Sequence, residues 1–531
     1  MPLVKNGKTL LSGVDPVCRA ERTADAVRVR DNTLYFCPSP LYGYGLARLL
    51  ARLESEAPNS AVLCVEADGE LYELTEKNID PSFADCRKLR VTNICDAGGL
   101  CAFVREAWGR AAFRYVEIIR FSGGWQLFPE LYDSLCGALR REIATDWSNA
   151  LTLTKLGRLY IRNALRNLPL VPRFPSAANI SFGEAPVLVL GAGPSLDETL
   201  DALKKRYSQI LCSPKRPFKI VCVDTCLGSL KDRGINPDMA VILESQHWNL
   251  RDFTGCRGWK IPFAADLSAL PASARILAGD GYMFMTPWTP LRIFERLKAA
   301  KMLPLVIPPL GSVGLTAVEL SRRLTSGKII CAGLDFSFSQ DKYHACGTPG
   351  HRGILSSQNR FRRIFNLAAY TQHSIAAVSK SGLSVYTSPA MKNYRDLFEQ
   401  EFGGDSRIFD IEGSGLPLGI KTLSLEEAMT ALDVNMVCKK PPQTAVVKNI
   451  SEDKVALFFE NEKKRLEELR NILSGVAAAD NERLNVLIDE CDYLWAHFPD
   501  CAGGRRPALN NISFLKRLRT EIDPAILLME R

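Results

Sequence analysis

The chain has 531 residues, and its 67 lysines and arginines against 59 aspartates and glutamates give a formal net charge of +8. This length exceeds what one hydrophobic core supports, so it predicts two or three domains. The hydrophobic fraction of 46% is that of an ordinary globular protein. The modest positive charge permits an anionic small ligand and gives no argument for nucleic acid as a partner.

The amino terminus lacks the charged and then apolar pattern of a signal peptide, and no apolar run reaches ~18 residues. We therefore expect a soluble, cytoplasmic protein without a membrane span. The 16 cysteines are scattered and form no Cys-x-x-Cys pair. Several of them, such as Cys64, Cys222 and Cys331, lie inside apolar, strand-like runs, which predicts buried free thiols of a reducing compartment instead of zinc ligands or disulfides.

Residues 1–168 are predicted to form a smaller α/β domain. A strand at 34–37 leads through a turn containing prolines and glycines to a helix at 46–53, and a second strand at 61–65 ends at Glu66. This order is typical of a nucleotide-binding fold, but prolines occupy its tight turn. Two roles stay open for this domain, a structural or acceptor-handling role and the binding of a ligand of its own.

Four prolines between positions 169 and 186 predict a linker, and a central α/β domain follows at 187–425. Its first strand, at 187–190, runs into Gly191 and Gly193 and then into an amphipathic helix, as in the first unit of a Rossmann-like fold. The glycines let the backbone approach a ligand, and Pro194 and Ser195 suit a helix start. Leu196 stands where a dinucleotide fingerprint has its third glycine, so a tight turn that binds nothing remains the alternative.

Two further strands of this domain end in acidic residues. The strand at 219–223 precedes Asp224 and Thr225, and the strand at 239–243 precedes Glu244. An acidic residue at the end of the second strand commonly binds a ribose hydroxyl. Because the carboxyl ends of parallel strands share one sheet edge, we expect these residues to line a ligand crevice.

A second glycine-containing turn follows a strand at 305–307 and precedes a helix expected at 317–324. Its free amides and hydroxyls at a helix start predict a cradle for a phosphate or a carboxylate. The turn has no lysine, so ATP hydrolysis by a P-loop mechanism is not expected. The candidate residues of this cradle are Gly311, Ser312, Val313, Gly314 and Thr316.

The strand at 328–333 leads to Asp335 and then to a loop that contains Tyr343 and His344. A histidine just beyond a sheet edge suits a general base, since its pKa lies near neutrality. A purely structural His344 is the alternative, and His247 is the second candidate base. No ligand spacing in the chain demands a metal ion.

Residues 426–531 are predicted to form a mostly helical C-terminal domain. Leucines at 466, 469, 473, 484 and 487 continue one apolar stripe. This stripe either packs against its own domain or forms a homo-oligomer.

Four segments in this order carry a family resemblance: GAGPSLDE from 191, VDTCLGSLKDRGINPDMAVILES from 223, GSVGLTAVEL from 311 and CAGLDFSFSQDKYHACGT from 331. They resemble the central domain of the motility-associated factor (Maf) glycosyltransferases over residues 186 to about 350, and the flanks suit the three-part layout of that family. Two features depart from the common pattern. The N-terminal turn is rich in proline, and Glu244 stands where aspartate is more usual.

The resemblance implies a Rossmann-like central domain similar to bacterial sialyltransferases. It also implies cytoplasmic transfer of a nonulosonic acid, such as pseudaminic or legionaminic acid, from its CMP donor to serines or threonines of flagellin. In such an inverting reaction His344 would act as base, with Asp335 orienting it. Gly191, Gly193 and Ser195 would approach the nucleotide. No cofactor is obligatory because CMP is a good leaving group.

Two other functions stay open. The same domain occurs in archaeal 6-hydroxymethylpterin pyrophosphokinases, an activity that would require ATP and magnesium held by Asp224, Glu244 or Asp335. A noncatalytic nucleotide-binding or flagellar interaction protein is the third reading.

Overall fold

The computed structural model describes residues 2–81, 86–207, 216–371, 373–432, 450–476, 480–501 and 506–530. Contacts divide the chain into two compact units. The first contains Met1–Arg158 and Trp495–Leu515, and the second contains Leu159–Leu494 and Lys516–Arg531. Both are α/β structures with parallel sheets, so the predicted fold class is confirmed.

The first unit is built on a four-stranded parallel sheet in the order β5-β4-β3-β6. Its strands are β3 (Thr33–Pro38), β4 (Ala61–Val65), β5 (Leu89–Thr92) and β6 (Tyr115–Ile118), and its helices are α1 (Pro16–Ala26), α2 (Leu46–Glu56), α3 (Gly69–Asn78), α4 (Ala97–Trp108) and the first part of α5 (Pro129–Asn167). Every residue of β3 and β4 is buried. Strands buried on both faces read as continuous apolar runs, which is why the sequence predicts these two well.

A short hairpin covers the carboxyl edge of this sheet. It consists of β1 (Leu3–Lys5) and β2 (Lys8–Leu11), which pair antiparallel. Leu10 packs with Leu41, just after β3, and its carbonyl accepts a 2.7 Å hydrogen bond from the Gly123 N–H, after β6. Lys5 forms a 2.7 Å ion pair with Asp68, after β4. The hairpin therefore contacts the segments that follow three of the strands.

The second unit contains a nine-stranded parallel sheet in the order β12-β11-β10-β9-β8-β7-β13-β16-β17. The bounds are β7 (Val187–Leu190), β8 (Lys219–Val223), β9 (Met239–Ile242), β10 (Phe263–Asp266), β11 (Gly281–Met285), β12 (Leu305–Val306), β13 (Ile329–Ala332), β16 (Ile408–Ile411) and β17 (Lys421–Leu423). A separate antiparallel hairpin, β14 (Ile375–Val378) with β15 (Ser384–Thr387), lies in the chain between β13 and β16.

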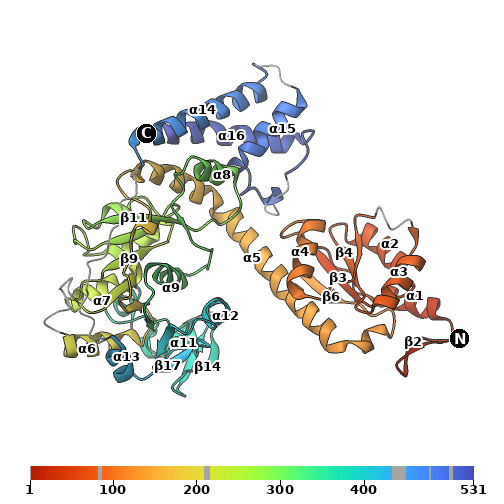
Figure 1. Cartoon of the computed structure of the whole chain (residues 1–531), viewed down its shortest axis with the longest axis horizontal. Coiled ribbons are helices and arrows are strands. Elements are labelled where there is room, and N and C mark those ends of the chain that lie inside the picture. The colour runs from red at the N-terminus through yellow and green to blue at the C-terminus, as the bar shows by residue number, and fades with distance from the viewer. Residues whose placement is uncertain are drawn as a thin grey trace. The chain divides into compact units, whose positions relative to one another are not determined.

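Helices of the second unit follow most strands. They are α6 (Leu196–Tyr207), α7 (Leu227–Asp232), α8 (Arg292–Ala299), α9 (Val313–Leu324), α10 (Pro349–Ser357), α11 (Leu367–Tyr370), α12 (Pro389–Phe402) and α13 (Leu425–Leu432). Helix α9 is almost entirely buried, and it packs against β7, β8, β9 and β13 in the middle of the sheet (Figure 1).

The C-terminal helices are α14 (Glu452–Leu473), α15 (Asn481–Glu490) and α16 (Ile512–Met529), and Figure 1 shows them as one group. Glu462 of α14 is 1% exposed and forms a 2.6 Å ion pair with Arg296 of α8. Leu466, Leu469 and Leu487 are buried within this unit. The predicted apolar stripe therefore packs inside the chain. The contacts place α14, α15 and most of α16 in the same compact unit as the central sheet, whereas the sequence predicts a separate domain beginning at 426. Homo-oligomer formation stays a prediction.

No helix among the described residues is long and apolar enough to cross a membrane. Each cysteine that the structure describes is free, and Cys64, Cys222 and Cys331 are buried as predicted.

Candidate functional site

The strand order of the nine-stranded sheet reverses between β7 and β13. From β7 the chain proceeds outward through β8 to β12, and it then returns to β13 on the other side of β7. The carboxyl ends of two strands that diverge in this way leave a crevice, the usual ligand site of open α/β sheets. Most residues singled out in the sequence follow β7, β8, β9 or β13, so they share this edge.

The Gly191–Gly193 turn lies against the turn that follows β13. The N–H groups of Gly191 and Gly193 donate 2.8 Å hydrogen bonds to the carbonyls of Ala332 and Gly333. A Cβ at Gly191 would lie 2.4 Å from the Gly333 carbonyl oxygen, and one at Gly193 would lie 2.6 Å from a carboxyl oxygen of Asp335. The absence of a Cβ thus permits close contact between two parts of the chain itself, and the approach of these glycines to a nucleotide stays a prediction.

Asp335 is joined to the start of α6. Its Oδ2 accepts a 2.7 Å hydrogen bond from the Ser195 N–H, and its Oδ1 accepts a 2.5 Å bond from the Ser195 hydroxyl. Burial raises the pKa of Asp335, while the bonds from Ser195 and the charges of Lys380 and Lys342 oppose that rise. Asp335 is 2% exposed. Because it follows β13 and both of its carboxyl oxygens bond to Ser195 after β7, it holds these two turns together.

A second buried carboxyl lies on the neighbouring strand. Lys380 forms a 2.5 Å ion pair with Asp410 of β16, and the two side chains are 6% and 1% exposed. Burial raises the pKa of Asp410 to about 6 against the opposing effect of Lys380. The sequence reasoning missed this pair. A signal was available in the Gly413-Ser414-Gly415 turn after β16, whose last glycine lies against Asp335.

His344 lies at the same switch point. A hydrogen bond to the backbone of Ala192 supports its imidazole, but burial is the larger influence and lowers the pKa of His344 below its usual value. A Cβ at Gly350 would lie 2.7 Å from its ring, and Tyr343 meets it edge-on at 5.0 Å. No hydrogen bond joins His344 to Asp335 among the described residues, because both carboxyl oxygens of Asp335 point to Ser195.

The loop around His344 is held by ion pairing. Lys342 pairs with Asp197 in the first turn of α6 and donates to the Pro194 carbonyl at 3.2 Å. His351 lies close enough to lower the pKa of His344, and its Nδ1 is buried without a hydrogen-bond partner. His344 and Lys342 therefore contact the β7 turn, and His351 lies beside His344.

A carboxyl pair follows β8. The Asn249 amide donates to Asp224 at 2.7 Å and to Asp252 at 3.4 Å, and the Thr225 N–H donates to Asp224 at 2.9 Å. Burial, together with the charges of Asp252 and Glu244, raises the pKa of Asp224 to about 7. Burial also raises the pKa of Asp252 to about 6. Asp252 lies in a 3-10 segment with no sequence pattern, so nothing local identified it.

Glu244 is the exposed member of this acidic group. Its carboxylate accepts a 2.8 Å hydrogen bond from the Gln246 N–H. Burial, with a contribution from the charge of Glu244, raises the pKa of Tyr160 to about 12 and also raises the pKa of Tyr394. Glu244 therefore faces two tyrosines from α5 and α12. No group of three or more histidines, cysteines or carboxylates among the described residues is placed to hold a metal ion.

The second glycine turn differs from the prediction. Helix α9 begins at Val313, four residues before the expected start, because Ser312 is its N-cap and accepts a 3.3 Å bond from the Gly314 N–H. Thr316 is fully buried and donates its hydroxyl to the Ser312 carbonyl at 3.0 Å. A Cβ at Gly314 would meet Leu334. Gly311, Ser312 and Val313 are the members of the predicted cradle that reach solvent.

The predicted site residues therefore form three neighbouring groups on one sheet edge. The switch-point group contains Gly191, Gly193, Pro194, Ser195, Asp335, Tyr343 and His344. Asp224, Thr225 and Glu244 follow β8 and β9, and the α9 start supplies the third group. Tyr394 links the last two groups, since it faces Glu244 and its ring would lie 3.1 Å from a Cβ at Gly311.

Three comparisons with known proteins each give a match. Residues 162–341 match the family model of the 6-hydroxymethylpterin diphosphokinase MptE-like proteins. An uncharacterized protein of Treponema pallidum (strain Nichols) is 27% identical over 534 residues, covering 96% of this chain and 90% of that protein. The structure of the Maf glycosyltransferase from Magnetospirillum magneticum AMB-1 aligns with a TM-score of 0.54 at 14% identity, covering 100% of this chain and 84% of that one.

The sequence match and the fold match point to the same resemblance that the four motifs indicated. The family model ends at residue 341, so it includes Asp335 but stops just before His344. The structural match extends over the flanking regions as well. The chain thus has the fold of the Maf glycosyltransferase, and its central residues are similar to the MptE-like proteins, which confirms the family resemblance read from the sequence.

Proposed function

We propose that this chain is a glycosyltransferase that moves a nonulosonic acid from its CMP donor to serines or threonines of flagellin. The observation that carries the proposal is the Maf glycosyltransferase fold over the whole chain. In addition, the half-buried His344 lies beside the β7 turn at the switch point of the sheet. We place the reaction in the cytoplasm and require no cofactor for it.

The proposed reaction is a displacement at the anomeric carbon of the donor sugar. The acceptor hydroxyl oxygen forms a bond to that carbon, the bond from the carbon to the CMP phosphate oxygen breaks, and CMP leaves with the electron pair. The hydroxyl proton passes to the His344 imidazole. Because burial lowers the pKa of His344, the ring is neutral at pH 7 and able to accept that proton.

The donor would occupy the edge between β7 and β9. Asp224 and Thr225 would hold the ribose or the base, and the α9 start at Ser312 would face the phosphate or the sugar carboxylate. Asp335 is a positioning residue in this scheme, since it orders Ser195 and touches no reacting atom.

A surface near this edge supports a protein acceptor. Between β13 and β16 the chain exposes large apolar side chains, with Phe361 75% and Phe365 67% exposed, and the Arg360 guanidinium lies 4.5 Å from the Phe361 ring. The Leu367 N–H donates to the carbonyl of Gln340, which joins this segment to the His344 loop. Exposed apolar clusters of this kind commonly mark protein interaction sites.

The experiment that tests the proposal co-expresses the chain with flagellin and the sugar pathway and weighs intact flagellin by mass spectrometry. Sugar-sized mass increments that require both the chain and the CMP-sugar are expected. Unmodified flagellin under conditions where the donor accumulates would contradict the proposal.

The second candidate is an MptE-like diphosphokinase, favoured by the family match and by the Asp224–Asp252 pair as a potential magnesium site. Thermal stabilisation separates the two functions. A ligand at ~100 times its Kd adds about 2.7 kcal/mol to native-state stability. Stabilisation by CMP without magnesium favours the transferase, whereas stabilisation by ATP only with magnesium favours the diphosphokinase.

A further inference from the structure

The first unit contains a hollow of about 870 Å³ at the amino-terminal edge of its sheet. Ser60 and Lys88 line it immediately before β4 and β5, and Asn32 lines it before β3. This is the edge opposite to the one that the β1–β2 hairpin covers. The volume falls in the range of sites that enclose a small molecule or a few peptide side chains.

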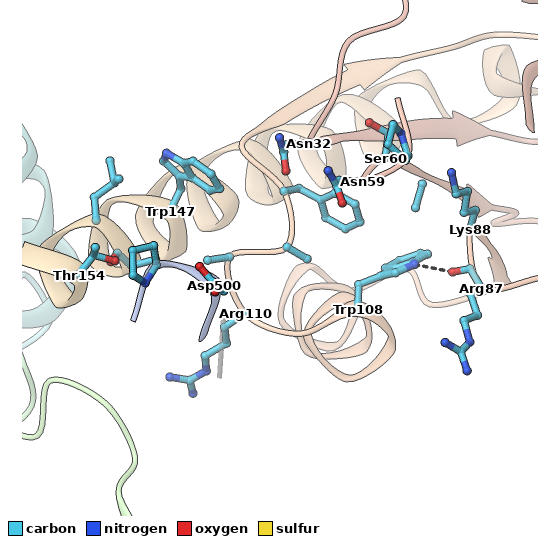
Figure 2. A pocket seen from close by; sticks show the side chains of 18 residues that line it. Asn32, Asn59, Ser60, Arg87, Lys88, Trp108, Arg110, Trp147, Thr154 and Asp500 are labelled. Atoms are coloured by element: carbon cyan, nitrogen blue, oxygen red, sulfur yellow. Dashed lines mark hydrogen bonds between the residues drawn. The ribbon is translucent and has the colours of Figure 1, made fainter. Parts of the chain in front are cut away.

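Two tryptophans form walls of the hollow. Figure 2 shows Trp108, the last residue of α4, and Trp147, from α5, on different sides of it. The Trp108 Nε1 donates a 2.8 Å hydrogen bond to the Arg87 carbonyl, and its ring meets Phe113 edge-on at 5.5 Å. An indole held in this way offers apolar contact area without losing further side-chain entropy on binding, which is typical of interface hot spots.

The rim of the hollow is basic. The side chains of Arg87 and Arg110 form no hydrogen bond or ion pair with any residue that the structure describes, and both residues are exposed. Lys88 already pairs with Glu54 at 2.8 Å. Asp500 is the one carboxylate among the described lining residues. Two guanidiniums are therefore available to carboxylates of a ligand.

Two polar groups of the lining, the Ser60 hydroxyl and the Asn59 amide nitrogen, already bond within the chain. The Ser60 hydroxyl donates to the Arg30 carbonyl at 2.9 Å and accepts from the Thr33 N–H at 3.0 Å. The Asn59 amide donates to Asp31 at 2.9 Å. A saccharide hydroxyl that lay against these bonded groups would lose its hydrogen bonds to water without replacing them, which is costly. Apolar side chains lose nothing in the same place.

We propose that this hollow docks a linear acidic segment of a partner protein. One aromatic or long aliphatic side chain of the segment enters between Trp108 and Trp147, and flanking aspartates or glutamates bind Arg87 and Arg110. Charge complementarity at the rim and the apolar surface of the two tryptophans select this occupant. The proposal stands independently of the sugar transfer proposed above, since every residue of it belongs to the first unit.

The test selects a random dodecapeptide phage library on the full-length protein and measures binding of the enriched peptides by fluorescence anisotropy. We expect enriched peptides with one large apolar residue flanked by acids. The double variant Arg87→Glu with Arg110→Glu should weaken binding at least tenfold, and added salt should weaken binding to the unchanged protein. The control, Arg19→Glu with Arg22→Glu, makes the same charge change on exposed positions of α1 and should bind normally.

The proposal fails if the selection yields no peptides, if the enriched peptides lack acidic residues, or if the two double variants bind them equally. Direct binding of free N-acetylneuraminic acid, with no peptide binding, would assign the hollow to an acidic sugar instead.

Discussion

Both parallel sheets of this chain are built from strand, turn and helix units with acidic residues after some strands, but their carboxyl edges differ in what covers them. In the first unit the buried Glu66 follows β4, and its oxygens accept hydrogen bonds from Ser39 at 2.6 Å, from the Asp68 N–H at 3.2 Å and from Tyr132 at 3.3 Å. The β1–β2 hairpin then covers the edge. In the second unit Gly193, Glu244 and Gly311 reach solvent.

This comparison shows that a strand, a turn, a helix and an acidic strand end together predict where a sheet edge lies. They do not predict whether that edge is covered or open to a ligand. A carboxyl group that is fully bonded under a cover stabilises the fold. Burial raises the pKa of Glu66 as well, so the distinguishing feature of Asp224 and Asp252 is that they share one amide beside the exposed Glu244. Raised pKa values at such an edge suit a binding or proton-transfer role. Four substitutions test this contrast.

His344→Ala should give the largest effect. Loss of a general base is expected to reduce sugar transfer by ~10²–10⁴-fold with donor binding retained. Because burial lowers the pKa of His344, the unchanged enzyme should lose activity only below the usual histidine value of about 6.5, as the imidazole protonates. The pH dependence of the transfer rate measures this directly. Full glycan occupancy with His344→Ala at limiting enzyme would move the assignment to His247 or a carboxyl group.

Gly193→Ala should destabilise the second unit by more than about 2 kcal/mol, since the added Cβ would lie 2.6 Å from Asp335. Gly69→Ala in the first unit is the matched control, because nothing lies within 4 Å of a Cβ at that position. Thermal unfolding of both variants measures the difference. Equal melting temperatures of the two variants would mean that the β7 turn accommodates a Cβ at position 193. The glycine would then be better explained by the approach of a ligand.

Asp224→Asn should change the pH dependence of stability. The pKa of Asp224 is about 7 in the folded chain and about 3.9 when unfolded, so the native state binds more protons and stability falls as the pH rises between these values. One pKa unit corresponds to about 1.4 kcal/mol. Relative to the unchanged protein, the asparagine variant should therefore gain up to a few kcal/mol in free energy of unfolding at pH 8 and little at pH 4. Urea unfolding at both pH values checks this, and a pH-independent difference would contradict it.

Glu66→Gln should have the smallest effect. Burial raises the pKa of Glu66, so its contribution to stability also falls as the pH rises above its unfolded value of about 4.3. The amide keeps one acceptor oxygen, and we expect a stability change within about 1 kcal/mol at neutral pH with normal sugar transfer. An activity loss comparable to that of His344→Ala would show that the N-terminal edge takes part in the reaction.

The sequence alone determined the strands at the centre of both sheets. The predicted strands at 61–65, 187–190 and 219–223 match β4, β7 and β8 in the structure. These strands are buried on both faces, so each appears as an uninterrupted apolar run that ends where the backbone reaches a polar edge. The glycine-containing turns and the acidic residues directly follow such runs, so the sequence also placed the candidate site at one edge of the sheet.

Tertiary structure decided what each edge residue touches. Ser195 meets Asp335 across 140 positions of sequence, and Asp224 meets Asn249 across 25. Local patterns carry no record of such pairs, so nothing in the sequence identified Asp252, and only the glycine turn after β16 pointed to the region of Lys380 and Asp410. The β1–β2 hairpin likewise covers the edge of the first sheet through contacts with Asp68 and Gly123, which lie far along the chain. Periodicity and turn chemistry act over a few residues, whereas burial, charge pairing and cover arise only when distant segments meet.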